Sequence, residues 1–296
     1  QVGFQFHASA NGVAAANAVF EVLQTPVPEH GDLPAPDLRS STIEIDGVSV
    51  ASRGAWAPAR LSASIRPGSL VALTGPSGAG KTTTTQVLLG LLTPERGRVR
   101  LVPDGGDPSS AVDLAQIDPA TWWEQIAWVP QRPTITPGTV LDNVLDHAEP
   151  GASTAEGIPD VLVEAARATG FDKVVDSLPQ GWQTPVGSAG VGLSVGQRQR
   201  LALTRALCSR TPLVVMDEPT AHLDAASEAH VLDAVRALHA SGRTVVVIAH
   251  RPALMALAEQ TIAVTSRPLT PADLVPDRVP DRESAHETAT AQKEAL

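Results

Sequence analysis

The sequence has no tyrosine and only one cysteine, Cys208, among its 296 residues. A single cysteine excludes an internal disulfide framework and fits a reducing compartment. Because Cys208 falls inside a helical pattern, we expect a packed, small apolar side chain there rather than a reactive thiol. The sequence also shows no signal-peptide pattern and no run of the roughly 18 apolar residues that a membrane-spanning helix needs.

Basic residues are scarce: 22 lysines and arginines face 32 aspartates and glutamates, a formal net charge of −10. A nucleic-acid surface needs clustered lysine and arginine, so we expect no nucleic-acid partner. Since aromatic residues make up only 3% of the chain, its core must come from valine, leucine, isoleucine and alanine. The length allows one large domain, or one domain with appendages.

The two ends of the chain differ in pattern from its middle. Residues 1–23 place apolar side chains at helical spacing, and residues 24–41 are rich in proline and polar side chains, which is typical of a linker. Because the linker sets the opening helix apart, and because the chain begins with Gln1, we expect a piece of a longer polypeptide. Residues 268–296 carry prolines, charges and the repeat VPDRVPDR, so we expect a flexible, solvated tail.

Between these ends, residues 42–267 alternate short strand patterns with helical patterns. Residues 42–50 alternate with period two, and four later runs have the composition of apolar strands: 69–75, 212–219, 244–250 and 261–266. This pattern predicts an α/β fold with a mainly parallel, buried sheet and helices on both faces. Strand signals stop between about 134 and 210, where we expect an inserted helical subdomain.

A glycine-rich stretch, GPSGAGKT, matches the pattern G-x-x-x-x-G-K-[ST] and lies between a strand and a helix. Its glycines let the backbone curl so that N–H groups point at phosphate oxygens. Lys81 supplies positive charge to the β and γ phosphates, and the Thr82 hydroxyl can bind Mg²⁺. We therefore predict a P-loop NTPase fold whose nucleotide-binding residues are Gly75, Pro76, Ser77, Gly78, Ala79, Gly80, Lys81, Thr82 and Thr83.

An acidic pair, Asp217 and Glu218, ends the apolar strand pattern LVVM. Asp217 is placed to hold Mg²⁺, and Glu218 to polarise the attacking water as a general base. An acidic pair at this point could instead supply negative charge to a helix N-terminus. The P-loop in the same chain favours the catalytic interpretation.

Two further polar side chains follow predicted strands. Gln131, in WVPQRP, could touch both Mg²⁺ and water, and His250, in VIAHR, could hydrogen-bond to a γ-phosphate. Alone, such a glutamine is usually solvated and such a histidine structural, but their positions relative to the P-loop and the acidic pair favour function. The predicted catalytic residues are Glu218, His250, Gln131 and Lys81, and the predicted Mg²⁺ ligands are Thr82, Gln131 and Asp217.

A second helix start also has the features of an anion site. The stretch GLSVGQRQRLALTRAL places a serine between glycines at the start of an arginine-rich helix. Free N–H groups and the positive end of the helix dipole would face an anion there. We call its central residues the signature segment: Leu193, Ser194, Val195, Gly196 and Gln197. The P-loop already performs this task, so the second start needs a separate explanation.

The order of P-loop, Gln131, LSVGQ, LVVMDEP, AHLD and His250 resembles the nucleotide-binding domain of ABC transporters, over residues 42–266. The resemblance implies a RecA-like core with an antiparallel β edge, and two such domains packed head to tail around ATP and Mg²⁺. The signature segment would then serve the partner's nucleotide, and Asp224 would lie at the same interface. It also implies a second half-transporter subunit, a transmembrane domain, and a place on the cytoplasmic face of the cell membrane.

The segments TPVGSAGVGLSVGQ and GTVLDNV are similar to those of exporters. Val195, where most members have glycine, together with QIDPATWWEQIAWVPQRP and residues 1–23, resembles the D subunit of CydDC-type exporters. That resemblance implies a heterodimer that exports a thiol (cysteine or glutathione) or haem for cytochrome bd assembly, with residues 1–23 as the cytoplasmic end of a transmembrane helix. The alternatives are a lipid or drug exporter, a soluble ABC ATPase acting on nucleic acid or ribosomes, and a small-molecule kinase.

The sequence departs from this family around the adenine. The family usually places an aromatic ring about where Ser52 falls in this chain. Trp56, four residues later, is the candidate for adenine stacking, with an ordinary core or surface tryptophan as the alternative. His222 replaces a usual small residue near Asp224, and we expect it to pack in the interface with the partner.

Overall fold

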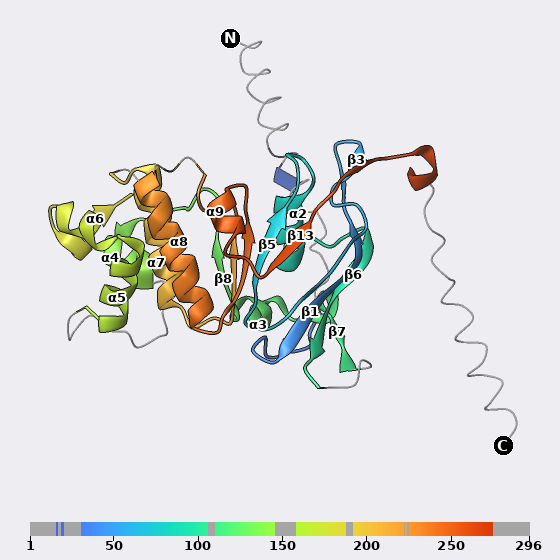
Figure 1. Ribbon diagram of the computed structural model, residues 1–296, viewed down its shortest axis with the longest axis horizontal. Coiled ribbons are helices and arrows are strands. Elements are labelled where there is room, and N and C mark those ends of the chain that lie inside the picture. Colours follow the sequence, from blue (N-terminus) through green and yellow to red (C-terminus); the bar gives the residue numbers. More distant parts are fainter. Residues whose placement is uncertain are drawn as a thin grey trace, which may run out of the picture.

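A computed structural model describes residues 16, 19–20, 31–105, 110–145, 158–187, 192–221, 223 and 225–274. The predictions for His222 and Asp224, and most of those for the opening helix, the linker and the tail, lie outside the described residues. Among the residues that are described, no helix combines the length and apolar character needed to cross a membrane. Figure 1 shows a part built on sheets and, beside it, a group of helices.

A five-stranded parallel sheet forms the centre of the fold, in the order β13-β5-β12-β11-β8. Its strands are β5 (Leu70–Thr74), β8 (Ile126–Val129), β11 (Leu213–Met216), β12 (Thr244–Ile248) and β13 (Gln260–Ala263). Every residue of β11 and β12 is buried, because the inner strands of such a sheet are covered on both faces. The parallel sheet predicted from the apolar runs is confirmed.

Side chains of β5 alternate between two hydrophobic cores. Val71 and Leu73 join the core that contains residues of α2 and α3, whereas Leu70 and Ala72 join the core on the other face, with α7, α8 and α9. Successive strand residues point to opposite faces, so helices cover both sides of the sheet. These helices are α2 (Lys81–Leu88), α3 (Pro119–Trp123), α7 (Val195–Cys208), α8 (Ala225–Ala240) and α9 (Pro252–Met255).

An antiparallel sheet adjoins the first of these cores, in the order β4-β1-β6-β7. Ile43 pairs with Ile65 on one side and with Leu101 on the other, and all three side chains are buried in that core. The predicted antiparallel edge is therefore present. Its elements are β1 (Ser41–Ser49), β4 (Leu61–Ile65), β6 (Arg96–Pro103) and β7 (Val112–Asp113), followed by the 3₁₀ helix η2 (Leu114–Gln116).

Three short strands form a further sheet, in the order β14-β3-β2. These strands are β2 (Ala51–Ser52), β3 (Ala55–Trp56) and β14 (Arg267–Pro268), and the 3₁₀ helix η5 (Pro271–Leu274) follows β14. The first residues of the predicted tail are therefore part of the folded domain. Residues 268–274, predicted to be flexible, form the end of β14 and η5.

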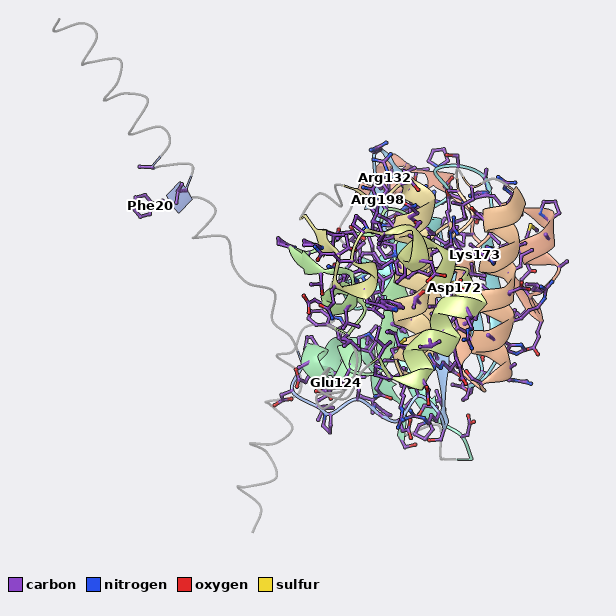
Figure 2. All side chains as sticks on the ribbon, turned by 90° about the vertical axis from the view of Figure 1, so that its left-hand side faces the viewer. Phe20, Glu124, Arg132, Asp172, Lys173 and Arg198 are labelled. Atoms are coloured by element: carbon purple, nitrogen blue, oxygen red, sulfur yellow. The ribbon has the colours of Figure 1, made fainter. Side chains whose placement is uncertain are left out.

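Helices dominate the region predicted as the helical subdomain, and they have a hydrophobic core of their own. The helix α5 begins after Pro159 and ends at Gly170, whose φ of 67° is the left-handed conformation of a glycine C-cap. In Figure 2 this part faces the viewer, with Asp172 and Lys173 labelled on it. Its other elements are α4 (Val140–Leu145), α6 (Asp172–Ser177), η4 (Gly181–Gln183) and the pair β9 (Gly138–Thr139) and β10 (Pro185–Val186).

The described end of the predicted linker is docked on the domain. The Leu33 N–H donates to the Gln116 carbonyl at 3.0 Å. The Gln125 side chain accepts the Leu38 N–H at 2.9 Å and donates to the Pro36 carbonyl at 3.0 Å. Backbone groups that a free linker would leave to water are thus bonded beside α3.

Candidate nucleotide-binding and catalytic site

The P-loop (residues 75–82) connects β5 to α2, as predicted. Gly75, Gly78 and Gly80 have φ values of 142°, 77° and 100°, which side chains other than hydrogen rarely allow. Gly80 is the N-cap of α2, so the N–H groups of the first helical turn lie at the end of the loop. A helix N-terminus after a glycine-rich loop is a general binding site for phosphate.

Two of these glycines are also required by close packing. A Cβ on Gly75 would overlap the carbonyl oxygen of Val264, and a Cβ on Gly80 would overlap the backbone of Ala57 and Pro58. A Cβ on Gly78 would meet no atom within 4 Å. The loop is therefore held between two backbone segments at its ends and is open at its middle.

Lys81 is only 6% exposed, and its ammonium group lies within the curl of the loop. It donates to the carbonyl oxygens of Gly75 at 3.0 Å and Pro76 at 2.9 Å. These partners are dipoles, whereas phosphate oxygens carry full negative charge and attract the ammonium more strongly. The Lys81 ammonium is therefore placed to exchange its carbonyl partners for phosphate.

Asp217 follows β11 and meets the first turn of α2. The Thr82 hydroxyl donates to Asp217 Oδ1 at 3.4 Å. Burial raises the pKa of Asp217, with a further rise from the Glu218 charge, while the Thr82 hydrogen bond and the charges of Lys81 and His250 oppose it. A cation at this position would favour the ionised carboxylate.

The oxygen atoms of Thr82 and Asp217 fit the predicted Mg²⁺. Mg²⁺ prefers oxygen ligands, and it usually binds one or two carboxylates together with substrate phosphates and water. Within the described part of the chain, no group of three or more histidine, cysteine, aspartate or glutamate side chains could enclose a metal. A cation held by few protein oxygens beside a phosphate cradle is the arrangement that these residues suit.

Glu218 brings the remaining predicted catalytic residues together. Its φ of 47° is unusual for a residue with a side chain, and such strain is concentrated at functional sites. Its Oε1 lies 2.9 Å from His250 Nε2, and its Oε2 accepts a hydrogen bond from Gln131 Nε2 at 2.9 Å. A water that replaced either partner would be placed to give its proton to the Glu218 carboxylate.

The signature segment begins α7 with a capping box. The Gln197 N–H donates to Ser194 Oγ at 3.3 Å, and the Ser194 N–H donates to Gln197 Oε1 at 2.7 Å. Leu193 is buried, whereas Val195 is 48% exposed at the first position of the helix. The cap fixes the helix start so that Val195 and Gly196 form its first turn.

Trp56 does not suit the predicted adenine stacking. It is 5% exposed, and the guanidinium carbon of Arg96 lies 4.7 Å from the centre of its ring. An adenine would have to displace an arginine that already forms a cation–π contact. Its burial and the contact with Arg96 favour the alternative interpretation, a core tryptophan.

A groove beside Gln131 was not predicted from the sequence. The groove has a volume of about 640 Å³. We call it the tryptophan groove because it is lined by Trp123 and Trp128, whose side chains are 49% and 48% exposed. Pro130 and Pro133, which flank Gln131, also line it, as does Glu124, labelled in Figure 2. The available signal was the presence of Trp123 and Trp128 in the one segment QIDPATWWEQIAWVPQRP.

Comparison with known proteins gives one family. The family model described as ABC transporter matches residues 59–221. A fatty acid ABC transporter ATP-binding/permease protein of Mycobacterium tuberculosis is 35% identical over 267 residues, which is 89% of this chain and 40% of that protein. An ATP-dependent lipid A-core flippase of Alkalilimnicola ehrlichii is 36% identical over 242 residues, which is 81% of this chain and 38% of that protein.

Structural comparison agrees with the sequence comparison. The solved structure of a bacterial Atm1-family ABC exporter with ATP bound superposes with a TM-score of 0.71 at 27% identity. The match covers 97% of this chain and 48% of that one. The chain therefore spans less than half the length of the relatives described here.

Proposed function

The chain belongs to the ABC transporter family, and on that premise we propose that it is the ATP-hydrolysing part of a membrane exporter. The single observation that carries this proposal is the meeting of Glu218 with His250 and Gln131 at the ends of the central strands. Those strands lead into the same edge of the sheet as the P-loop, since all of them are parallel. The nucleotide cradle and the group that activates water therefore share one edge.

Each predicted site residue has a separate role in ATP hydrolysis. Lys81 and the N–H groups at the start of α2 hold the phosphates of ATP, and Glu218 accepts the proton of the attacking water. His250 and Gln131 orient Glu218 and then contact the γ-phosphate and the water. Thr82 and Asp217 would hold Mg²⁺, which supplies charge neutralisation at the phosphates when it is bound.

The signature segment explains the second anion-ready helix start. We propose that Ser194, Gly196 and the N–H groups of α7 meet the γ-phosphate of an ATP held by the P-loop of a partner domain, with Asp224 at the same interface. The side chain of Val195 is exposed at this helix start, in keeping with an interface position. Each of two ATP molecules would then be shared between two domains.

We propose two candidate classes of transported substrate. A heterodimeric exporter of a thiol or haem for cytochrome bd assembly is supported by LSVGQ and by QIDPATWWEQIAWVPQRP. The names of two relatives, the fatty acid transporter and the lipid A-core flippase, favour a second candidate, a lipid exporter. The two candidates share the ATPase chemistry and differ in the membrane domain, which we place on the same subunit.

The tryptophan groove is the surface that we assign to the membrane domain. Its floor lies beside α7, since Ala202, Arg205 and Ala206 line it together with the exposed tryptophans. Exposed apolar surface of this kind marks an interaction site. A membrane segment seated there would push directly on the chain around Gln131, which contacts Glu218.

Cysteine labelling tests this docking. Cys208 is the only cysteine and its pKa is raised by burial to about 11, so it reacts slowly with maleimide near neutral pH. We expect Trp128→Cys to be labelled about tenfold more slowly in the membrane assembly than in the isolated chain. The control is Val161→Cys on α5, which replaces a 55% exposed side chain outside the groove and should react equally in both. Equal rates for Trp128→Cys would contradict the assignment.

A further inference from the structure

Residues 264–273, called here the C-terminal strap, begin at the P-loop. The carbonyl of Val264 packs directly on Gly75, and the Val264 N–H donates to the Thr74 carbonyl at 2.8 Å. The next residue, Thr265, accepts the Ala59 N–H at 2.9 Å. The strap is therefore tied both to the loop that cradles phosphate and to the chain that leads into β4.

From there the strap runs along the hairpin of β2 and β3, which we call the β2–β3 hairpin. Arg267 pairs with Trp56, and Pro268 pairs with Ala55, as the third strand of that small sheet. The strap then crosses the hairpin turn, where the Leu269 N–H donates to a hairpin carbonyl at 2.9 Å. Figure 1 shows this crossing as the long segment between β13 and β3.

The chain leaving the hairpin returns to the P-loop at its other end. Ala57 and Pro58 follow β3 directly, and their backbone packs on Gly80 so closely that a Cβ there would overlap it. The strap contacts the loop at Gly75, and the hairpin exit contacts it at Gly80. Together they close a ring of backbone around both ends of the phosphate cradle.

Four hydrogen bonds to the Asp273 carboxylate hold this ring together, and we call Asp273 with these bonds the clasp. Its Oδ1 accepts hydrogen bonds from Arg267 at 2.8 Å and from Arg96 at 3.2 Å, and its Oδ2 accepts from the Thr270 N–H at 2.8 Å and hydroxyl at 2.7 Å. The side chain is 7% exposed. Arg96 in turn covers the ring of Trp56, so one carboxylate joins the strap, β6 and the hairpin.

The charge of this carboxylate persists over the whole neutral range. The hydrogen bond from Arg267, followed by those from the N–H and hydroxyl of Thr270, holds the pKa of Asp273 well below its usual range. A carboxyl group whose pKa falls on folding stabilises the fold above its unfolded pKa and loses that effect only in acid.

We propose that Asp273 is a positioning residue of the nucleotide site, which fixes the hairpin exit against Gly80 and thereby the N-terminus of α2. The proposal rests on the proposed function, namely that the P-loop binds ATP. Asp273 lies outside the P-loop, and its hydrogen bonds go to Arg267, Arg96 and Thr270. It acts through the ring of backbone, so its effect falls on phosphate affinity.

The test measures binding of ATP and of inorganic tripolyphosphate to the full 296-residue chain by calorimetry, well below its melting temperature. We expect Asp273→Ala to raise the Kd of both ligands by about fivefold, in the range usual for residues that act through a packed network. Asp273→Asn keeps an acceptor for Thr270 but loses the charge that holds the two arginines, so its Kd should lie between those of Asp273→Ala and the original chain.

The matched control is Asp233→Ala, which removes an exposed ion pair with Arg236 on α8 and should leave both Kd values unchanged. A lower melting temperature with unchanged Kd values for Asp273→Ala would overturn the proposal, since the clasp would then serve stability alone. Weaker binding of ATP without weaker binding of tripolyphosphate would also overturn it. If the original chain bound neither ligand, the proposed function itself would fail.

Discussion

Replacement of Glu218 by glutamine should reduce ATP turnover by about three orders of magnitude, within the range expected for loss of a general base. The amide keeps the size of the side chain and can still bond to Gln131 and His250, which lie 2.9 Å from the carboxylate oxygens. It cannot take a proton from water. ATP affinity should therefore stay the same, and steady-state hydrolysis with equilibrium ATP binding measures the two effects separately.

A matched variant separates the base from a general loss of charge. Glu228→Gln removes a carboxylate on α8 that accepts a hydrogen bond from Arg251 at 2.8 Å. Arg251 directly follows His250 in the sequence. That variant should keep turnover within about threefold, since its amide oxygen can still accept the hydrogen bond from Arg251. Hydrolysis by Glu218→Gln within tenfold of the original rate, in the assembled complex, would contradict the assignment of Glu218.

The second large effect is expected at Gly80. Alanine there must adopt a φ of 100° and would overlap the backbone of Ala57 and Pro58. The left-handed conformation and the overpacking together should destabilise the fold by about 2 to 5 kcal/mol. In a domain of this size the melting temperature should fall by about 10 °C, and ATP binding should be lost because the start of α2 moves.

Gly78→Ala is the control for this prediction. Gly78 also has a positive φ, at 77°, but a Cβ there would meet no atom within 4 Å. Its melting temperature should fall by only about 2 to 4 °C, the effect of roughly 1 kcal/mol of backbone strain. An equal fall in melting temperature for both variants would show that the loss of stability comes from the positive φ alone, and that the contact of Gly80 with the hairpin exit does not contribute to it.

The parts of the site that were predictable are local in sequence. The glycines and Lys81 of the P-loop lie within seven consecutive residues, so their pattern is complete without the fold. The apolar runs that became β11 and β12 are buried along their whole length, which is why composition alone identified them. Asp217 and Glu218 follow directly from the end of such a run.

The parts that were not predictable depend on contacts between distant segments. Trp56 was predicted as a candidate for adenine stacking because it lies four residues after Ser52, but its side chain is buried and the Arg96 guanidinium lies over its ring. No local pattern shows that the strap would pack on Gly75. The docking of Leu38 on Gln125 was equally hidden, since a proline-rich composition is typical of a free linker.

The measurement that tests the central claim most directly is purification of the native assembly from membranes, with this chain as bait, and identification of its components by mass. We expect a membrane-spanning polypeptide, fused to this chain or bound to it, together with a second ATPase subunit. A different half-transporter in that position would support the heterodimer. A complex without any membrane-spanning segment would contradict the proposal that this ATPase drives an exporter.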